Sequence, residues 1–184
     1  MLHSFTPLKL PPYSSLKHLE GQGNYAISKY YKLPYRFFYR YKLRMILGLM
    51  PKGVIYHNIL DFGSGSGIFE LALKKHALFV KQLDLNSIID RRWKFDAIVC
   101  SSVLEFCQFP YTTSLLSDFL KPGGKLYIAS PMETKLTRLY FKLIKDKNKR
   151  NSHAKILSEI SKQFRIEKYH SWMNLYFALR ASKI

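Results

Sequence analysis

Three glycines and a preceding aspartate form the part of the sequence best suited to bind a ligand. Residues 58–67 are Asn-Ile-Leu-Asp-Phe-Gly-Ser-Gly-Ser-Gly, so the glycines directly follow a short apolar stretch. Glycine lets a backbone turn sharply and lets a ligand approach without an intervening Cβ atom. We therefore expect a nucleotide-like ligand to lie across Gly63, Ser64, Gly65 and Gly67.

Two carboxylates indicate which chemical groups that ligand carries. Asp61 precedes the first glycine, where a carboxylate can meet a cationic ligand group but would repel a pyrophosphate. Asp84 follows Gly65 by 19 residues, the separation expected of a carboxylate that accepts hydrogen bonds from ribose hydroxyls. The alternative is that the glycines only make a tight turn and that Asp84 caps a helix. A dinucleotide oxidoreductase would have its third glycine one position later than Gly67.

The elements around this loop alternate between strands and helices, which predicts an α/β fold. Such alternation is typical of a parallel sheet with helices on both faces. The C-terminal part breaks the alternation, and its last two strands predict an antiparallel hairpin at the sheet edge. We therefore expect a Rossmann-like three-layer sandwich. Strands are expected at 58–61, 77–83, 95–101, 125–130, 164–169 and 175–181, and helices at 34–50, 68–75, 115–120, 134–144 and 154–163.

Length and composition predict one ordered domain. A chain of 184 residues with 47% hydrophobic residues can bury one sizeable core. Residues 1–29 carry enough Pro, Ser and Gly to predict an irregular arm, which leaves 30–184 as the domain. No apolar run approaches the roughly 20 residues of a membrane helix, and Lys9 and Pro11 interrupt the N-terminal stretch, so we expect a cytoplasmic protein. Cys100 and Cys107 lie among apolar residues, which predicts neither a disulfide nor a metal site.

Positive charge is concentrated at the two ends of the sequence. The net charge is +8 over residues 1–60, zero over 61–133 and +10 over 134–184. Such flanks favour an anionic partner, namely nucleic acid, an anionic lipid surface or a phosphorylated substrate. A solvated, lysine-rich surface explains the same charge equally well. Oligomeric state has no signature in the sequence.

Three blocks of the sequence resemble the class I S-adenosylmethionine-dependent methyltransferases, in particular their small-molecule branch. The blocks are 59–67, the stretch 95–105 (Phe-Asp-Ala-Ile-Val-Cys-Ser-Ser-Val-Leu-Glu) and the stretch 120–130 (Leu-Lys-Pro-Gly-Gly-Lys-Leu-Tyr-Ile-Ala-Ser). The resemblance implies S-adenosylmethionine as cofactor and a small acceptor. The roles that it implies are Asp61 near the methionine amino group, Gly63 and Gly65 under the cofactor, Asp84 on the ribose, and Ser101, Ser102 and Val103 around the methyl group.

One departure from the family lies on the adenine side of the expected site. Only eleven residues separate Asp84 from Asp96, so the third family strand is expected to be missing. The short segment that begins at Leu85 must then close this side of the pocket. We expect Trp93, or Ile88 and Ile89 beside it, to pack against adenine, since a flat apolar ring can replace a lost wall by stacking. The alternative is that Trp93 packs in the core beneath Phe95.

A second departure concerns the chemistry of the acceptor. Phe106 stands where many relatives have a histidine, so general-base catalysis is not expected from that position. Glu105 is the remaining candidate to accept a proton or to bind a cationic acceptor, and the alternative is a polar helix start. Methyl transfer needs mainly in-line positioning and exclusion of water. We therefore expect methylation of an O or N atom of a small or lipid-like acceptor, with a nucleic-acid methyltransferase and a non-catalytic cofactor-binding protein as alternatives.

Overall fold

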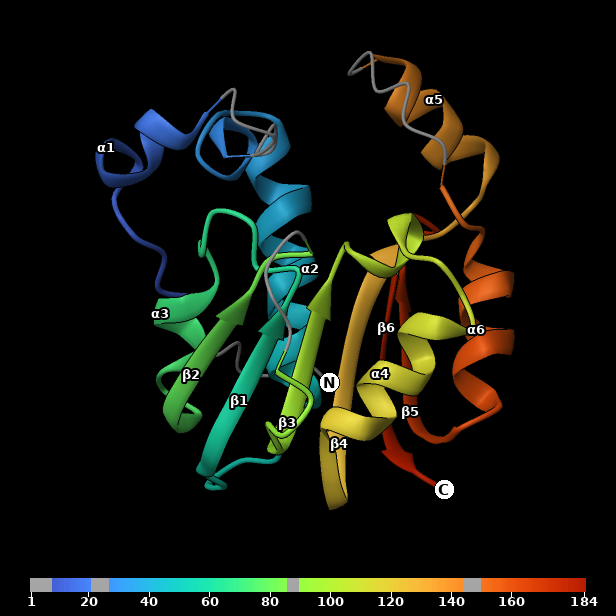
Figure 1. The fold of residues 1–184 in the computed structure, drawn as a ribbon. Helices are drawn as coiled ribbons and strands as arrows, with labels where there is room; N and C mark the ends of the chain where they lie inside the picture. Colours follow the sequence, from blue (N-terminus) through green and yellow to red (C-terminus); the bar gives the residue numbers. More distant parts are fainter. Residues whose placement is uncertain (1–7, 21–26, 86–89, 144–149) are drawn as a thin grey trace.

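A six-stranded sheet forms the centre of the molecule (Figure 1). The computed structural model describes residues 8–20, 27–85, 90–143 and 150–184. The strand order is β2-β1-β3-β4-β6-β5, with β1 to β4 parallel and β6 antiparallel to both β4 and β5. The strands are β1 (Tyr56–Phe62), β2 (Ala77–Leu83), β3 (Phe95–Ser101), β4 (Leu120–Pro131), β5 (Phe164–Trp172) and β6 (Tyr176–Lys183).

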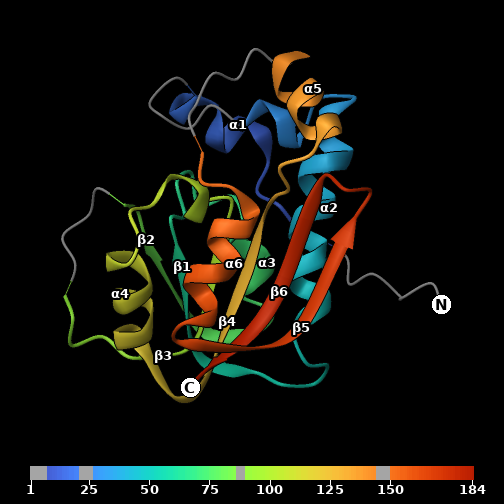
Figure 2. The same cartoon turned by 90° about the vertical axis from the view of Figure 1, so that its right-hand side faces the viewer.

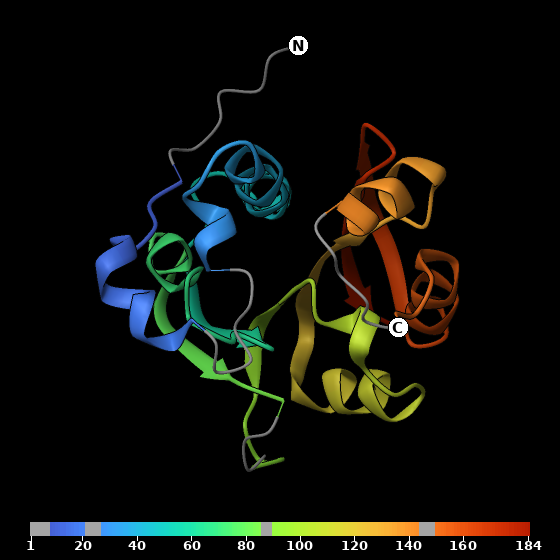
Figure 3. The same ribbon diagram turned by 90° about the horizontal axis from the view of Figure 1, so that it is seen from above.

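Helices cover both faces of this sheet, which confirms the expected three layers (Figures 2 and 3). The longest helix, α2, lies on one face, and α4 and α6 lie on the other. The helices are α1 (Tyr13–Leu16), α2 (Tyr35–Leu49), α3 (Glu70–Leu73), α4 (Tyr111–Phe119), α5 (Lys135–Leu143) and α6 (His153–Ser161). Short 3-10 turns are η1 (Lys17–Leu19), η2 (Ser28–Tyr30) and η3 (Leu104–Phe106).

Alternating side chains of the central strands divide the core into two halves. In β3, Ala97 and Val99 face the half that contains α2, whereas Ile98 and Cys100 face the half that contains α4 and α6. All four side chains are fully buried. A strand buried on both faces has an unbroken apolar sequence, as β3 does. Strand β3 therefore packs against both halves of the core along its length.

The sheet lacks the third family strand, as expected. No strand occurs among the described residues between Leu83 and Phe95, so β2 is the edge of the sheet. The C-terminal hairpin is also confirmed, because β5 and β6 pair antiparallel at the opposite edge. The order and direction of the strands therefore agree with a Rossmann-like fold.

Several elements differ in extent from the expected ones. Strand β4 begins at Leu120, because the Pro-Gly-Gly sequence after it is an irregularity within the strand, opposite Asp96, and does not end the pairing. Helix α3 is only four residues long. Within residues 1–29, α1 and η1 form, and Leu16 is buried in the α2 half of the core. Across the described ranges, no helix is long and apolar enough to cross a membrane.

The packing of the core predicts that two phenylalanines contribute very differently to the free energy of unfolding. Phe119 is fully buried and packs edge-on against Phe95, whereas Phe79 on β2 is 63% exposed. Phe119→Ala should lower the free energy of unfolding by about 3–5 kcal/mol, because it leaves a cavity. Phe79→Ala should change it by less than about 0.5 kcal/mol. Urea unfolding measures both, and equal losses would contradict this division of the core.

Candidate functional site

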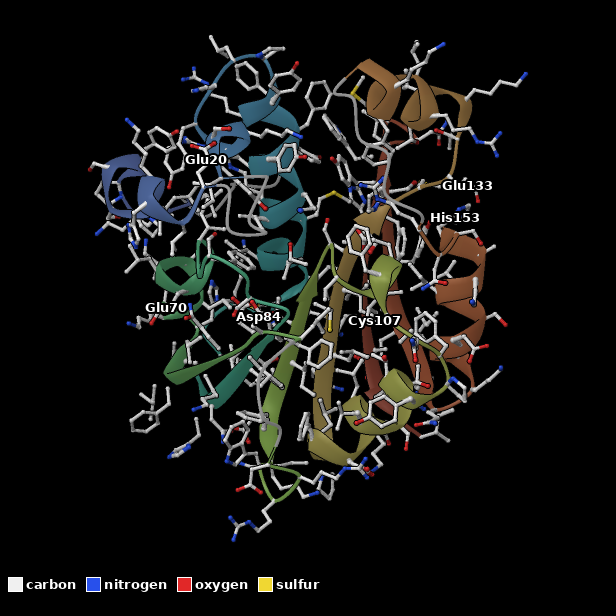
Figure 4. All side chains as sticks on the ribbon, turned by 45° about the horizontal axis from the view of Figure 1, so that its top comes forward. Glu20, Glu70, Asp84, Cys107, Glu133 and His153 are labelled. Carbon is white, nitrogen blue, oxygen red and sulfur yellow. The ribbon has the colours of Figure 1, made fainter. Side chains whose placement is uncertain are left out.

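The candidate site lies where the parallel strands end (Figure 1). Asp61 is the penultimate residue of β1, the glycine loop follows it, and Ser101 ends the neighbouring strand β3. Asp84 comes directly after β2 and lies on the same side of the sheet (Figure 4). Carboxyl ends of parallel strands meet at one edge, which is where ligands bind in open α/β sheets. The fold therefore brings most of the predicted residues together.

The glycine loop has a conformation that other residues adopt only with strain. Gly63, Gly65 and Gly67 have φ values of 71°, 51° and 68°, all in the left-handed region. The Gly63 amide donates a 2.7 Å hydrogen bond to the carbonyl oxygen of Leu83 at the end of β2. A Cβ atom on Gly63 would collide with the side chain of Val103. The loop is therefore packed directly between the ends of β2 and β3.

Asp61 is a buried carboxylate beneath this loop. The residue is 3% exposed, and its Oδ2 atom has no hydrogen-bond partner among the described residues. Burial, together with the negative charge of Glu70, raises the pKa of Asp61 to about 7. An unpartnered buried carboxylate is costly to hold. Its place suits a ligand that brings a positive charge and hydrogen-bond donors.

The residues after β3 have an unusual backbone as well. Ser102 has a φ of 55°, which is uncommon for a residue other than glycine. Its amide donates a 2.8 Å hydrogen bond to the carbonyl oxygen of Ala129 on β4. The Ser101 hydroxyl is buried without a hydrogen-bond partner in the described part of the chain, and Val103 is 4% exposed. Such local strain is often found at functional sites.

Lys42 of α2 joins this group, although the sequence analysis did not single it out. Its Nζ atom donates a 2.7 Å hydrogen bond to the Ser102 hydroxyl and lies 3.4 Å from the Tyr30 hydroxyl. The residue is only 2% exposed. None of the ion pairs among the described residues includes it. Burial lowers the pKa of Lys42 to about 8, against a smaller opposing effect of Glu105.

A signal for Lys42 was nevertheless present in the sequence. Tyr39, Met45, Ile46 and Leu49 lie at helical spacing from position 42 and are all buried. A lysine on the buried stripe of an amphipathic helix is exceptional. The three arginines of the same helix lie on a neighbouring face, so the charge of position 42 does not stand out in the sequence of this helix.

Glu105 is the second buried charge on this side of the site. It is 3% exposed, and its Oε2 atom accepts a 2.6 Å hydrogen bond from the Ser130 hydroxyl. Its backbone carbonyl accepts a hydrogen bond from the Asn151 amide. Burial raises the pKa of Glu105, although the Ser130 hydrogen bond and the charge of Lys42 oppose this rise. Lys42 and Glu105 are close enough for the charge of each to influence the pKa of the other.

The structure does not bring Trp93 to the glycine loop, contrary to the expectation for it. The ring lines a groove of ≈ 550 Å³ with Asn58, Phe79 and Phe95, near the amino ends of the strands. The Lys81 ammonium lies 4.7 Å from the ring centroid. A residue just before β3 must lie at the edge opposite to the site, because β3 runs parallel to β1. The alternative position beneath Phe95 agrees with this packing.

The remaining predicted residues lie at the edge of the site. Asp84 and Leu85 are exposed, and Leu85 is the first residue of the segment expected to close the adenine side. Ile88 and Ile89 lie outside the described residues. Within the described ranges, no group of three or more His, Cys, Asp or Glu side chains is placed to hold a metal ion.

Comparison with known proteins supports the fold alone. Neither a protein-family model nor a curated protein sequence matches the chain. Among solved structures, the N-methyltransferase NodS from Bradyrhizobium japonicum, in complex with S-adenosylhomocysteine, is similar with a TM-score of 0.62 and 14% identity. That match covers 93% of this chain and 97% of NodS.

Two further structures match with similar scores. A SAM-dependent methyltransferase from Thermotoga maritima, described as a possible histamine N-methyltransferase, has a TM-score of 0.60 and 16% identity over 91% of this chain and 99% of its own. Human N-acetylserotonin methyltransferase in complex with SAM has a TM-score of 0.58 and 15% identity, over 94% of this chain and 62% of its own. The chain therefore has the Rossmann-like fold of these methyltransferases, as the resemblance implied.

The buried amine of Lys42 predicts a pH-dependent stability difference. Below pH 8 the folded protein must hold a buried ammonium, whereas the unfolded chain keeps it in water up to its ordinary pKa of 10.5. Lys42 therefore lowers stability most below pH 8, and this cost shrinks as the pH rises toward 10.5. The stability advantage of Lys42→Met over the wild type should fall by about 2 kcal/mol between about pH 7 and pH 9.5.

Urea unfolding of both proteins at the two pH values measures this difference. Other groups titrate equally in the two proteins, so only the change in the difference matters. A difference that stays constant across this pH range would contradict the burial of a titrating Lys42 amine.

Proposed function

We propose that this protein is an S-adenosylmethionine-dependent methyltransferase that methylates an O or N atom of a small or lipid-like acceptor. The observation that carries the proposal is the buried Asp61 carboxylate, which has an unpartnered oxygen directly beneath a loop of three left-handed glycines. A cationic amino group with hydrogen-bond donors would satisfy that oxygen. S-adenosylmethionine carries such a group and has no phosphate that Asp61 would repel.

The residues of the loop and its neighbours fit this cofactor. In the proposed arrangement Asp61 meets the methionine amino group, while Gly63, Ser64, Gly65 and Gly67 lie under the cofactor. Asp84 accepts hydrogen bonds from the ribose, and Leu85 lies beside it on the adenine side. Ser101, Ser102 and Val103 surround the methyl group, and Trp93 is left out because of its position near the amino ends of the strands.

The acceptor is proposed to enter on the side of Lys42 and Glu105. The cofactor would supply a methyl group that is already activated on a sulfonium sulfur, so the protein has to position the acceptor, exclude water and take up a proton. Lys42 is suited to receive that proton, because its lowered pKa of about 8 leaves a fraction of neutral amine near neutral pH. Glu105, held by Ser130, is suited to bind a donor group of the acceptor.

The structural neighbours support the same proposal at the level of chemistry. NodS is described as an N-methyltransferase and was solved with S-adenosylhomocysteine, and human N-acetylserotonin methyltransferase was solved with SAM. Both act through a fold that this chain shares along most of its length. The observations that point to the cofactor in this chain are its own Asp61, glycine loop and Ser102 backbone.

Calorimetry with S-adenosylhomocysteine tests the placement of the cofactor through two matched variants. Gly65→Val puts a branched side chain where the ligand is proposed to lie, and it should abolish measurable binding. Gly53→Val is the control, because Gly53 also has a positive φ of 75° but lies in an open turn between α2 and β1. Both variants place a valine at a positive φ, and only the first should lose the ligand.

Two results would contradict the proposal. If the wild-type protein fails to bind S-adenosylhomocysteine and S-adenosylmethionine at millimolar concentration, the chain does not use this cofactor. If a folded Gly65→Val protein keeps the wild-type affinity, the cofactor does not lie across the loop.

The raised pKa of Asp61 predicts that cofactor affinity depends on pH. The ammonium of the ligand prefers the ionised carboxylate, so binding should strengthen as the pH rises through about 7. The dissociation constant of S-adenosylhomocysteine should fall about tenfold between about pH 6 and pH 8. In Asp61→Asn the affinity should be lower by about 1–3 kcal/mol, and this contribution to the pH dependence should vanish.

Comparison of the variant with the wild type isolates Asp61, since Lys42 titrates nearby in both proteins. Asp84→Ala serves as the control: it should weaken binding but keep the wild-type pH profile. Identical pH profiles for Asp61→Asn and the wild type would place the ligand's amino group elsewhere.

A further inference from the structure

Two leucines of helix α5 face the solvent. Leu136 and Leu139 are 47% and 54% exposed, whereas Thr137 between them is 1% exposed and bonds to Thr134. A surface helix of a globular protein normally shows the opposite arrangement, with its apolar stripe against the core. This side of α5 is therefore suited to contact an apolar partner.

Similar side chains lie at the start of α2 and at the tip of the C-terminal hairpin. Leu33 and Phe37, four residues apart, are 60% and 59% exposed, and Met173 between β5 and β6 is 62% exposed. Trp172 stacks on Tyr41 with a centroid distance of 4.2 Å, which holds the hairpin tip against α2. The exposed side chains at the tip and on α2 therefore belong to one neighbourhood.

These elements lie around the carboxyl ends of the strands, where the candidate site is (Figures 1 and 3). The start of α2 lies on one side of the carboxyl ends of the strands, and α5 lies on the other. We call the five exposed apolar side chains of these elements the docking rim. Its members are Leu33, Phe37, Leu136, Leu139 and Met173.

The docking rim is accompanied by positive charge. Neither α2 nor α5 contains an acidic residue, and apart from the buried Lys42 their sequences hold six lysines and arginines. Lys32, Lys135 and Lys142 are exposed beside the rim. The exposed acid Glu133 is paired with Arg138 at 3.0 Å, so it leaves the surrounding charge positive. Exposed apolar side chains ringed by cations are the pattern of an interface with anionic lipid.

We propose that the docking rim binds the surface of an anionic lipid bilayer. The rim side chains would enter the boundary between headgroups and acyl chains while the lysines meet the anionic headgroups. Because the rim surrounds the candidate site, a lipid-like amphiphile would reach the acceptor side directly from the bilayer. This statement about the acceptor rests on the proposed methyltransferase function, whereas the docking itself does not.

Two other occupants fit these observations less well. A nucleic acid would use the lysines but would leave the aliphatic side chains of Leu136 and Leu139 without a role. A second copy of the chain, docked rim to rim about a twofold axis, would place two cationic surfaces against each other. An anionic bilayer satisfies both the apolar side chains and the charge.

Sedimentation with vesicles of phosphatidylcholine, with and without phosphatidylglycerol, tests the proposal. The wild-type protein should bind the anionic vesicles and bind pure phosphatidylcholine at least about tenfold more weakly. Phe37→Ser/Leu139→Ser should lower the partition coefficient on anionic vesicles by more than about tenfold, because two apolar side chains are lost from the interface. Lys135→Gln/Lys142→Gln should lower it by roughly 25-fold, at about fivefold for each cation.

The matched control is Leu78→Ser/Phe79→Ser on strand β2. These side chains are 65% and 63% exposed, as apolar as the rim, but they belong to the edge strand and lie outside the rim. This control should bind anionic vesicles within about twofold of the wild type. Equal losses for the control and for Phe37→Ser/Leu139→Ser would overturn the proposal, as would full retention of binding by the latter.

Two further measurements separate the competing occupants. Sedimentation velocity that shows a wild-type dimer, converted to monomer by Phe37→Ser/Leu139→Ser, would assign the rim to a second copy and overturn bilayer docking. Binding to a single-stranded RNA oligonucleotide without binding to anionic vesicles would also overturn it. Calorimetry with S-adenosylhomocysteine on the same variants reports the cofactor site independently, so vesicle binding without cofactor binding would refute only the methyltransferase function.

Discussion

The hydrogen bond between the Gly63 amide and the Leu83 carbonyl is the contact on which the site depends. It joins the end of β1 to the end of β2 over 2.7 Å, and it forms because Gly63 adopts a left-handed φ of 71°. The same residue packs so closely on Val103 that a Cβ atom would not fit. One glycine therefore links the ends of three neighbouring strands, and the polar groups at those ends are arranged around it.

This arrangement places two charges where they destabilise the folded chain. Asp61 and Lys42 are both nearly fully buried, and burial shifts the pKa of each toward its neutral form. Neither has an ion-pair partner among the described residues. Asp61 lies near the end of β1, whereas Lys42 of α2 donates a hydrogen bond to Ser102, which follows β3. Apolar residues of similar size would stabilise both positions. Proteins keep such costly groups where function requires them.

Much of the fold followed from local patterns in the sequence. The edges of β2 and β3 were predicted to the residue, because short apolar runs bounded by turn residues are specific signals. Helix α2 followed from its 3.6-residue period. The Pro-Gly-Gly sequence suggested a turn before β4, but pairing with β3 carries the strand past it, which only the tertiary structure determines. The predicted residues of the glycine loop and of the end of β3 lie together in the structure, because they belong to contiguous motifs at the ends of neighbouring parallel strands.

The positions of Lys42 and Trp93 were not predicted, because they depend on how distant parts of the chain are arranged in space. Lys42 is 60 residues from Ser102 in sequence, and no local motif connects the two. Trp93 was assigned to adenine because it is near Asp84 in sequence, yet the segment between β2 and β3 must cross the whole height of the sheet. Its last residues therefore end at the opposite edge. Consideration of strand direction alone would have corrected this assignment.

The missing third strand changes how the two ends of the site are built. With β2 as the sheet edge, Asp84 and Leu85 are exposed. Lys42 of α2, Glu105 after β3 and Ser130 of β4 are instead buried. In the proposed arrangement, the buried residues are therefore the ones that select the acceptor. Helix α2 contains both Lys42 and Phe37 of the docking rim, so in the two proposals one helix contributes to the acceptor side and to the bilayer contact.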